Sequence, residues 1–284
     1  MPEPHDGRRA LHLPGFTYLP QFFSVAECDE LIACFASLRP IWERRYAPPG
    51  SPLGGEGGRR LTRPVYWLGA WQFACLGYYA EPEHREDRCV RAEPLPTSMT
   101  RILDRLRPVL ADDHADDHAD APPPADPLPN TCLVNYYGRE VGDGVPVDFA
   151  RLKMHRDGEP GPVVMISVGQ PGLLEFLDPD RSPDPELAVW TRNRSVSILS
   201  GPDFKDRLYH RVSRVRSGAQ PVMTCSVDRF ELRRVSVSFR HVPAELIQDF
   251  GQLPVERRDA VRGYVNELSE GSEHWRQQLA TERG

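Results

Sequence analysis

The sequence predicts a mostly β fold, a jelly roll (double-stranded β-helix) whose core is buttressed by helices that precede it. From Thr131 onward, short runs of β-prone residues recur at regular intervals. Turn signals such as Gly142-Asp143-Gly144 and Ser200-Gly201-Pro202 separate these runs. Ahead of them lie two segments with helical periodicity. Many short, evenly spaced strands are typical of a β-sandwich or barrel.

The N-terminal part predicts a loose leader followed by a helix. Residues 1–15 are expected to form a flexible leader. Ser24 and Glu27 have the spacing of a capping box, and the apolar residues that follow recur on one helical stripe. Pro40 is expected to end this helix.

The next segments alternate between loop, strand and helix. Residues 47–58 contain Pro and Gly clusters typical of a loop, and residues 61–79 are rich in β-prone and aromatic residues. Residues 97–110 predict a second helix. Residues 111–128 form an acidic low-complexity insertion with a repeated Asp-Asp-His-Ala motif. A metal site there is the alternative, but nothing in this segment would bury or fix the ligands.

The predicted core spans residues 129–242. Its expected strands are Cys132–Tyr137, Lys153–His155, Pro162–Val168, Leu173–Leu177, Leu187–Thr191, Ser195–Leu199, Tyr209–Val212 and Leu232–Arg240. Residues 16–110 are expected to carry the N-terminal helices and the aromatic-rich strands that follow the first of them. Residues 243–284 predict a helical extension, so the whole chain is expected to form one catalytic domain.

Composition excludes several classes of protein. The chain has 284 residues, 39% of them hydrophobic, and no apolar run long enough for a transmembrane helix. No signal peptide is recognisable, so a cytoplasmic location is expected. The six cysteines form no Cys-x-x-Cys pair. Nothing in the composition implies an oligomer.

Charge is unevenly distributed along the chain. The net charge of −6 argues against nonspecific coating of nucleic acid, but it leaves room for a local basic groove. Residues 42–69 carry five basic and two acidic residues, and residues 205–216 carry five basic and one acidic. These two segments are either solvated loops or contacts for an anionic partner.

Two histidines and one aspartate suggest a metal centre. His155 and Asp157 are two positions apart, which on a strand places both side chains on one face, roughly 6.6 Å apart. His210 lies far enough along the chain for several strands to intervene. Two histidines with one carboxylate are the ligands of a non-haem Fe(II) site with three open positions. By itself, a His-x-Asp pair is a weak signal that chance often supplies.

The last predicted strand strengthens this interpretation. Residues 232–240 alternate, so that Val235 and Phe239 share one face while Arg234 and Arg240 share the other. Inward arginines need anionic partners, which a dicarboxylate cosubstrate or the metal-site aspartate would provide. The alternative is an edge strand with a solvated polar face.

The block from Asn130 to Arg240 resembles the AlkB family of Fe(II)/2-oxoglutarate dioxygenases. The matching pieces occur in the family's order and end in an Arg-x5-Arg pair. They are Asn130–Tyr137, His155-Arg156-Asp157-Gly158-Glu159, Val164–Gly169, Ser200-Gly201, Tyr209–Val212 and Arg234–Arg240. Arg60–Arg63 with Tyr66–Gly69 resembles the family's nucleotide-recognition lid less closely.

The resemblance implies roles for the cofactor-binding residues. His155, Asp157 and His210 would bind Fe(II). The residues that would bind the cosubstrate 2-oxoglutarate are Asn135, Tyr137, Arg234, Ser236 and Arg240. Of these, Arg234 would pair with the distal carboxylate, Ser236 would make a weak contact, and Arg240 would lie nearer the metal.

The resemblance also implies a substrate site. Glu159 would read the edge of an alkylated base, and Trp67 or Tyr66 would stack on that base after it leaves the helix. Arg63 and Arg211, together with Arg214, would contact phosphates. For Trp67 the alternative is a core position among other aromatic residues.

The implied reaction is oxidative demethylation of N-alkylated bases in single-stranded DNA or RNA. It consumes dioxygen and 2-oxoglutarate and releases formaldehyde, succinate and CO2. Two alternatives remain: a 2-oxoglutarate oxygenase that acts on a protein or small molecule, which the acidic composition favours, and a binding module with a spent site. No membrane partner is expected.

Overall fold

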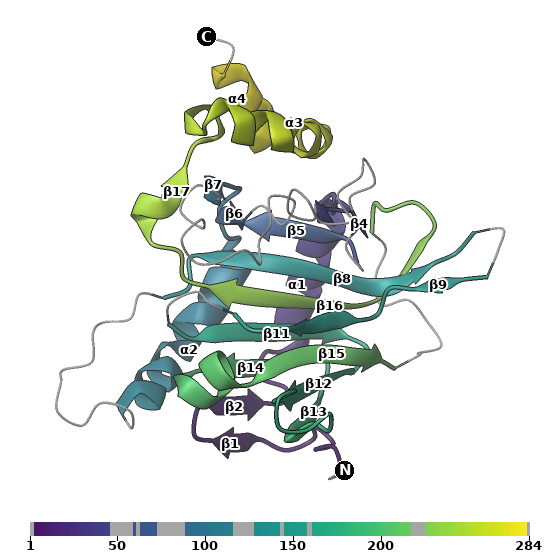
Figure 1. Ribbon diagram of the computed structural model, residues 1–284, viewed down its shortest axis with the longest axis vertical. Coiled ribbons are helices and arrows are strands. Elements are labelled where there is room, and N and C mark those ends of the chain that lie inside the picture. The colour runs from purple at the N-terminus through teal and green to yellow at the C-terminus, as the bar shows by residue number, and fades with distance from the viewer. Residues whose placement is uncertain are drawn as a thin grey trace.

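Two antiparallel sheets stack to form the centre of the protein (Figure 1). The computed structural model describes residues 3–45, 59–60, 63–72, 89–115, 128–142, 145–157, 161–216 and 225–282, with the backbone alone for 44–45, 59–60, 111–115 and 260. None of the helices in these ranges is long and apolar enough to span a membrane. The two stacked sheets agree with the predicted jelly-roll core.

The larger sheet is built from eight strands in the order β1-β2-β14-β11-β16-β8-β5, with β9 paired to β8. The strands are β1 (Leu11–Leu13), β2 (Phe16–Leu19), β5 (Val65–Leu68), β8 (Thr131–Glu140), β9 (Val147–Asp148), β11 (Val163–Gly169), β14 (Ser195–Leu199) and β16 (Phe230–Arg240). Alternation divides the sheet into two faces. In β16, Val235 and Phe239 pack into the main apolar core, whereas Arg234 and Arg240 lie on the other face, as predicted.

The smaller sheet lies across that second face and has the order β10-β15-β12-β13. Its strands are β10 (Leu152–His155), β12 (Gly172–Leu177), β13 (Leu187–Thr191) and β15 (Tyr209–Val215). Phe16 of the larger sheet and Phe176 of the smaller sheet meet with ring centroids 5.0 Å apart. The space between the sheets is therefore largely apolar, and the polar inward residues of β16 have to find partners within it.

Two helices cover the opposite face of the larger sheet, behind it in Figure 1. The first helix, α1 (Val25–Ser37), begins at Ser24 with the predicted capping box, in which Ser24 and Glu27 bond reciprocally. The second helix, α2 (Thr97–Ala115), runs five residues beyond the end predicted for it. It therefore includes the start of the segment predicted as an insertion, of which residues 116–127 lie outside the described residues.

The C-terminal extension is helical, as predicted, and lies at one end of the molecule (Figure 1). It comprises η5 (Ala244–Leu246), β17 (Ile247–Gln248), η6 (Phe250–Gln252), α3 (Val255–Ser269) and α4 (Glu273–Thr281). β17 extends a small sheet made with β6 (Ala70–Gln72) and β7 (Cys89–Arg91), and Trp275 of α4 packs edge-on against Trp71 of β6 at 5.6 Å. A further pair, β3 (Arg44–Arg45) and β4 (Arg59–Arg60), completes the strands.

The N-terminal leader differs from its prediction. Instead of a loose segment, residues 11–13 form β1 on the edge of the larger sheet. Further upstream, His5 bridges to Val189 of β13, with its amide bonded to the Ala188 carbonyl at 2.8 Å. This segment has few apolar residues, so its strand pairing is driven by backbone hydrogen bonds that periodicity does not reveal.

Candidate functional site

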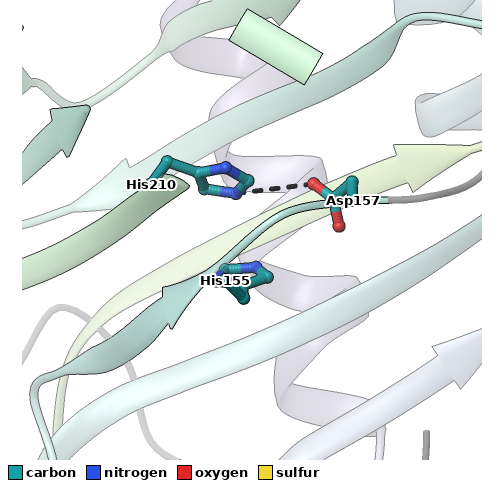
Figure 2. A group of neighbouring side chains, drawn as sticks. All are labelled: His155, Asp157 and His210. Atoms are coloured by element: carbon teal, nitrogen blue, oxygen red, sulfur yellow. Dashed lines mark ion pairs between the residues drawn. The ribbon is translucent and has the colours of Figure 1, made fainter. Parts of the chain in front are cut away.

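The three predicted metal ligands meet at one edge of the smaller sheet. His155 is the last residue of β10, and it lies directly opposite His210 of β15 in the antiparallel pair. Asp157 follows just after β10 ends. Figure 2 shows the three side chains pointing toward one another. All three are buried, with exposed fractions of 9%, 5% and 2% for His155, Asp157 and His210.

The geometry of these side chains fits a single ion. Their ligand atoms all lie within 4.8 Å of one another, and His210 Nε2 is 3.4 Å from Asp157 Oδ2. His155 Nδ1 is 2.9 Å from the carbonyl oxygen of Lys153, which selects the tautomer that donates from Nδ1 and leaves Nε2 free as a ligand. Asp157 Oδ2 is buried and makes no hydrogen bond to any described residue.

The protonation states of the three groups also suit a metal. Burial, and to a smaller extent the neighbouring His155, lowers the pKa of His210 to about 3. Burial likewise lowers the pKa of His155. For Asp157, burial alone would raise the pKa, but the Arg240 charge and the two histidines outweigh it and keep the pKa below its ordinary value. At neutral pH the site thus holds neutral imidazoles and an ionised carboxylate, the forms that bind metal.

Arg240 holds the metal-site carboxylate in place. Its Nε and Nη2 atoms donate to Asp157 Oδ1 at 3.0 and 2.6 Å, and its side chain is 4% exposed. This contact turns Oδ2 toward the histidines. The aspartate is thus the anionic partner for one of the two inward arginines of β16.

Arg234, the other inward arginine, lies at the far end of the same strand face among neutral acceptors. It donates to the carbonyls of Gln170 and Thr191, to Ser167 Oγ and to Thr191 Oγ1, at 2.7 to 3.1 Å. No described carboxylate pairs with it. Burial lowers the pKa of Arg234 to about 10, so the group remains a cation at neutral pH. A buried cation with neutral partners only is costly, and a bound dicarboxylate would neutralise it.

Gly172 makes room for the Arg234 side chain. A Cβ atom at residue 172 would lie 2.9 Å from Arg234 Nε and 3.0 Å from its Cζ. Gly172 begins β12, and its carbonyl accepts a bond from Thr191 Oγ1 at 2.9 Å. Sequence reasoning missed this residue, because an isolated glycine at the start of a strand carries no signal of its own.

Asn135 and Tyr137 lie on β8 beside these arginines. In the register of the sheet, Asn135 is opposite Ser236 and Tyr137 is opposite Arg234, so the predicted cosubstrate residues share one face. Ser236 is 5% exposed, and its carbonyl accepts a long bond from Asn135 Nδ2 at 3.4 Å. The structure therefore brings together the five side chains predicted to bind 2-oxoglutarate.

Arg63 is located differently from its prediction. It was expected to contact phosphates, but it is 5% exposed and donates from Nε to Asn135 Oδ1 at 2.7 Å. Its guanidinium also lies over the Tyr137 ring, 5.6 Å from the centroid. Val65, two residues later, pairs with Asn135 across the sheet, which draws Arg63 inward. This arginine thus contacts the proposed cosubstrate residues.

Trp67 and Tyr66 belong to the core and are not available for stacking on a base, contrary to their prediction. Trp67 is 5% exposed, and its indole Nε1 donates to Glu43 Oε1 at 2.9 Å. Tyr66 is 3% exposed and donates its hydroxyl to Glu93 at 2.9 Å. Because each polar atom has a buried or partly buried partner, both rings are fixed inside the protein.

The remaining predicted substrate residues are Arg211 and Glu159. Arg211 lies on the outer face of the smaller sheet, where its Nε donates to Glu175 at 2.7 Å. That ion pair already neutralises the charge expected to contact phosphate. Glu159 lies outside the described residues.

The donor set fits Fe(II) and 2-oxoglutarate. Two neutral imidazoles and one carboxylate gathered around a common point match a facial triad. The cation of Arg234, on the same inner face, matches a dicarboxylate cosubstrate. The metal ligands and Arg234 all lie in the space between the two sheets.

Among known proteins, the family profile agrees with this chemistry. The sequence profile of the 2OG-Fe(II) oxygenase superfamily matches residues 15–240. The solved structure of OsALKBH1 is 19% identical, with a TM-score of 0.47, over 82% of this chain and 100% of that one. An oxidoreductase of the 2OG-Fe(II) oxygenase family from Burkholderia pseudomallei is 16% identical, with a TM-score of 0.43, over 79% of this chain and 84% of that one. No curated protein matches.

The superfamily match covers most of the chain and includes every residue of the metal centre. Proteins of this superfamily are oxidoreductases that use Fe(II), 2-oxoglutarate and dioxygen. The chain belongs to the 2OG-Fe(II) oxygenase superfamily.

Proposed function

We propose that this dioxygenase demethylates N-alkylated bases in nucleic acid, as the AlkB family does, releasing formaldehyde, succinate and CO2. The observation that carries the proposal is the pair of inward arginines in the Arg-x5-Arg ending. Arg240 donates to the metal-site carboxylate, and Arg234 is surrounded by neutral acceptors. The same chain also carries the His-x-Asp-x-Glu motif by which it resembles that family.

His155, Asp157 and His210 would hold Fe(II), with Arg240 fixing the orientation of the carboxylate. When bound, Fe(II) with 2-oxoglutarate and dioxygen supplies the oxidation of a substrate C–H bond. The chain's own contribution is to keep both imidazoles neutral and the carboxylate ionised, as their lowered pKa values require. Burial of all three side chains also limits access of water to the site.

Arg234 would pair with the distal carboxylate of 2-oxoglutarate, since it is a buried cation whose described partners are all neutral oxygens. Asn135 and Tyr137 would donate to the cosubstrate from the adjacent strand. Arg63 occupies the acceptor oxygen of the Asn135 amide, whereas the NH2 group makes only long bonds, to the Leu133 and Ser236 carbonyls at 3.3 and 3.4 Å, and so is the side that would turn to a carboxylate. These contacts would orient the cosubstrate along the inner face of β16.

The test uses purified protein with Fe(II), ascorbate and 2-oxoglutarate on a single-stranded oligonucleotide containing 1-methyladenine or 3-methylcytosine. The expected result is loss of the methyl group, detected by mass spectrometry of the oligonucleotide. Restoration of neither base, with 2-oxoglutarate still consumed, would contradict the proposal.

An Asp157→Ala variant provides the first prediction about the site. Loss of the carboxylate ligand, together with loss of the negative charge that neutralises Arg240, is expected to reduce turnover by more than the roughly 10- to 100-fold typical of outer-shell changes. The matched control is Asp203→Ala, an exposed carboxylate that pairs with Arg207. Equal turnover by wild type and the Asp157 variant would show that the ligand assignment is wrong.

A second candidate is oxidation of a protein or small molecule. It is favoured by one observation: the aromatic residues predicted to stack on a flipped base, Trp67 and Tyr66, are core residues. Succinate formation that a methylated oligonucleotide does not stimulate would support this candidate instead.

A further inference from the structure

Five arginines gather at the end of the sandwich that lies away from the metal centre. They come from three separate segments: the N-terminal stretch, the turn between β13 and β14, and the end of β15 with the residue after it. They are Arg8, Arg192, Arg194, Arg214 and Arg216. None has a role in binding the metal or the cosubstrate.

A bulge in β15 brings two of these arginines to the outer face of the smaller sheet. Val212 pairs with Leu174, but Arg214 pairs with Leu173, so Ser213 is an extra residue between them. The bulge shifts the alternation by one residue. As a result Arg214 and Arg216 are both exposed, while Val215 between them is buried.

Trp190 fixes the guanidinium groups of these two arginines. Arg214 Cζ lies 5.1 Å and Arg216 Cζ 4.4 Å from the centroid of the same indole ring. Trp190 pairs with Leu173, and Leu173 with Arg214, so the three side chains are lateral neighbours across three strands. Stacking on an aromatic face holds an arginine in place while its N–H groups remain available to an anion.

The other three arginines line a groove of about 550 Å³ next to this pair. Arg192 donates from Nε to the Asp6 carbonyl at 2.7 Å, and Arg194 donates from Nη1 to the Phe23 carbonyl at 3.3 Å. Both keep further N–H groups beyond these bonds. The groove is also lined by Asn193, whose Oδ1 accepts from the Gly169 amide at 3.0 Å.

The pair and the groove form one continuous surface. The amide of Arg216 donates to the carbonyl of Pro171, a residue that lines the groove. The Tyr18 hydroxyl bonds to the carbonyls of both Gly7, another lining residue, and Trp190. We call the surface made by the five arginines the arginine groove.

The charge of the arginine groove is only partly compensated, by Asp6, whose pKa is lowered by a hydrogen bond from the Arg8 amide and by the charges of Arg8 and Arg192. Arg8 lies 3.6 Å from Asp6, but in the described part of the chain no ion pair joins Arg192, Arg194, Arg214 or Arg216 to a carboxylate. Elsewhere on the surface the arginines are commonly neutralised, as Arg211 is by Glu175 and Arg207 by Glu186. Unneutralised cations grouped in a protein of net charge −6 favour an anionic partner.

We propose that the arginine groove binds the phosphate backbone of the nucleic acid strand whose base enters the metal centre. This inference rests on the proposed function. Planar guanidinium groups match phosphate oxygens in bidentate geometry. β15 links the two sites directly, because His210 is at its start and Arg216 follows its end, a separation of roughly 20 Å at about 3.3 Å per residue. At about 3.4 Å per stacked nucleotide, the groove would contact the strand roughly six nucleotides from the reacting base.

The test is binding of a fluorescent, unmodified single-stranded 20-mer, measured by anisotropy over a range of KCl concentrations. Wild type is compared with an Arg214→Gln/Arg216→Gln double variant. For single strands, each phosphate contact contributes about 0.7 to the slope of log K against log salt, so two lost contacts are expected to reduce the slope by about 1.4. Wild type is also expected to bind the 20-mer more tightly than a 6-mer, and the variant is expected to lose that preference.

The matched control is Arg101→Gln/Arg276→Gln, which removes the same charge from arginines that are already paired with Glu30 and Glu273. Melting temperatures check that all variants fold. An unchanged slope in the Arg214/Arg216 variant, an equal fall in the control, or no binding of the 20-mer by wild type would each overturn the proposal. Demethylation is assayed separately. Demethylation by wild type with an unchanged slope in the Arg214/Arg216 variant overturns only the role of the arginine groove. A reduced slope without demethylation by wild type supports strand binding by the arginine groove and overturns the proposed function.

Discussion

At the scale of single residues, the two inward arginines of β16 divide the site into a metal end and a cosubstrate end. Arg240 is neutralised by Asp157, which it orients, whereas Arg234 meets neutral oxygens only. Their six-residue spacing keeps both on one strand face while separating them along the strand. A cosubstrate with a carboxylate at each end suits that separation of charge.

Arg63 is expected to position Asn135 for the cosubstrate. An Arg63→Ala change removes the bond to Asn135 Oδ1 and allows the amide to rotate, so the KM for 2-oxoglutarate is expected to rise about tenfold or more. The affinity for Fe(II) is expected to stay within about twofold, because Arg63 is a minor electrostatic influence on His155, whose pKa is lowered mainly by burial. Steady-state kinetics and a metal titration measure the two quantities.

An Arg63→Lys variant is the control for this effect. Its ammonium group can still donate to the Asn135 amide, so part of the cosubstrate affinity is expected to return. If both variants lose iron and cosubstrate affinity in parallel, Arg63 has only a structural role.

At the scale of elements, much of the jelly-roll core could be predicted from alternation and turn signals. The strands predicted at Leu187–Thr191 and Ser195–Leu199 have the bounds found for β13 and β14, and the capping box locates the start of α1. By contrast, β1 has only three residues, and α2 continues into a polar repeat without apolar periodicity. Neither β1 nor the last five residues of α2 could therefore be predicted from periodicity.

The site could be predicted only where a residue's role follows from its strand face. The metal ligands and the two arginines lie on inner faces that alternation reveals. The core position of Trp67 depends on Glu43, a partner 24 residues away that no local pattern indicates. The inward turn of Arg63 likewise depends on a partner 72 residues away.

The start of β12 offers a test of the packing around Arg234. A Gly172→Ala change would place a methyl group 2.9 Å from Arg234 Nε and push the guanidinium out of its pocket. The KM for 2-oxoglutarate is expected to rise about tenfold or more, with little change in iron affinity. A tenfold change corresponds to about 1.4 kcal/mol, close to the lower end of the roughly 1.5–3 kcal/mol for a hydrogen bond to a charged group.

Gly263→Ala is the matched control, since a Cβ at residue 263 in α3 meets nothing within 4 Å. That variant is expected to keep its cosubstrate affinity and to gain up to about 1 kcal/mol in stability from higher helix propensity. An unaltered KM in Gly172→Ala would show that Arg234 does not contact the cosubstrate.

At the scale of the whole molecule, the sandwich holds its polar site between the smaller sheet and the face of the larger sheet opposite the helices. The same arrangement makes folding depend on pH. His155 and His210 both have pKa values lowered by burial, the latter to about 3. Because the unfolded chain binds protons near the ordinary histidine value of 6.5 and the folded chain does not, the metal-free protein is expected to lose stability as pH falls below about 6.5.

Urea unfolding of the metal-free protein at pH 7 and pH 5.5 measures this loss. His210 is expected to contribute about 1 kcal/mol to the difference, and His155 to act in the same direction. A His155→Gln/His210→Gln variant, which has no imidazole to protonate at the site, is expected to show a smaller difference. Equal unfolding free energies at the two pH values in wild type would contradict the assignment of neutral, buried imidazoles.

The most direct test of the central claim measures succinate and formaldehyde together in one reaction with a methylated single-stranded oligonucleotide. Succinate and formaldehyde are expected in equal amounts from wild type, and neither is expected from Asp157→Ala. Succinate without formaldehyde from the oligonucleotide would contradict nucleic acid demethylation, and the absence of both, with iron bound, would contradict the metal and cosubstrate site itself.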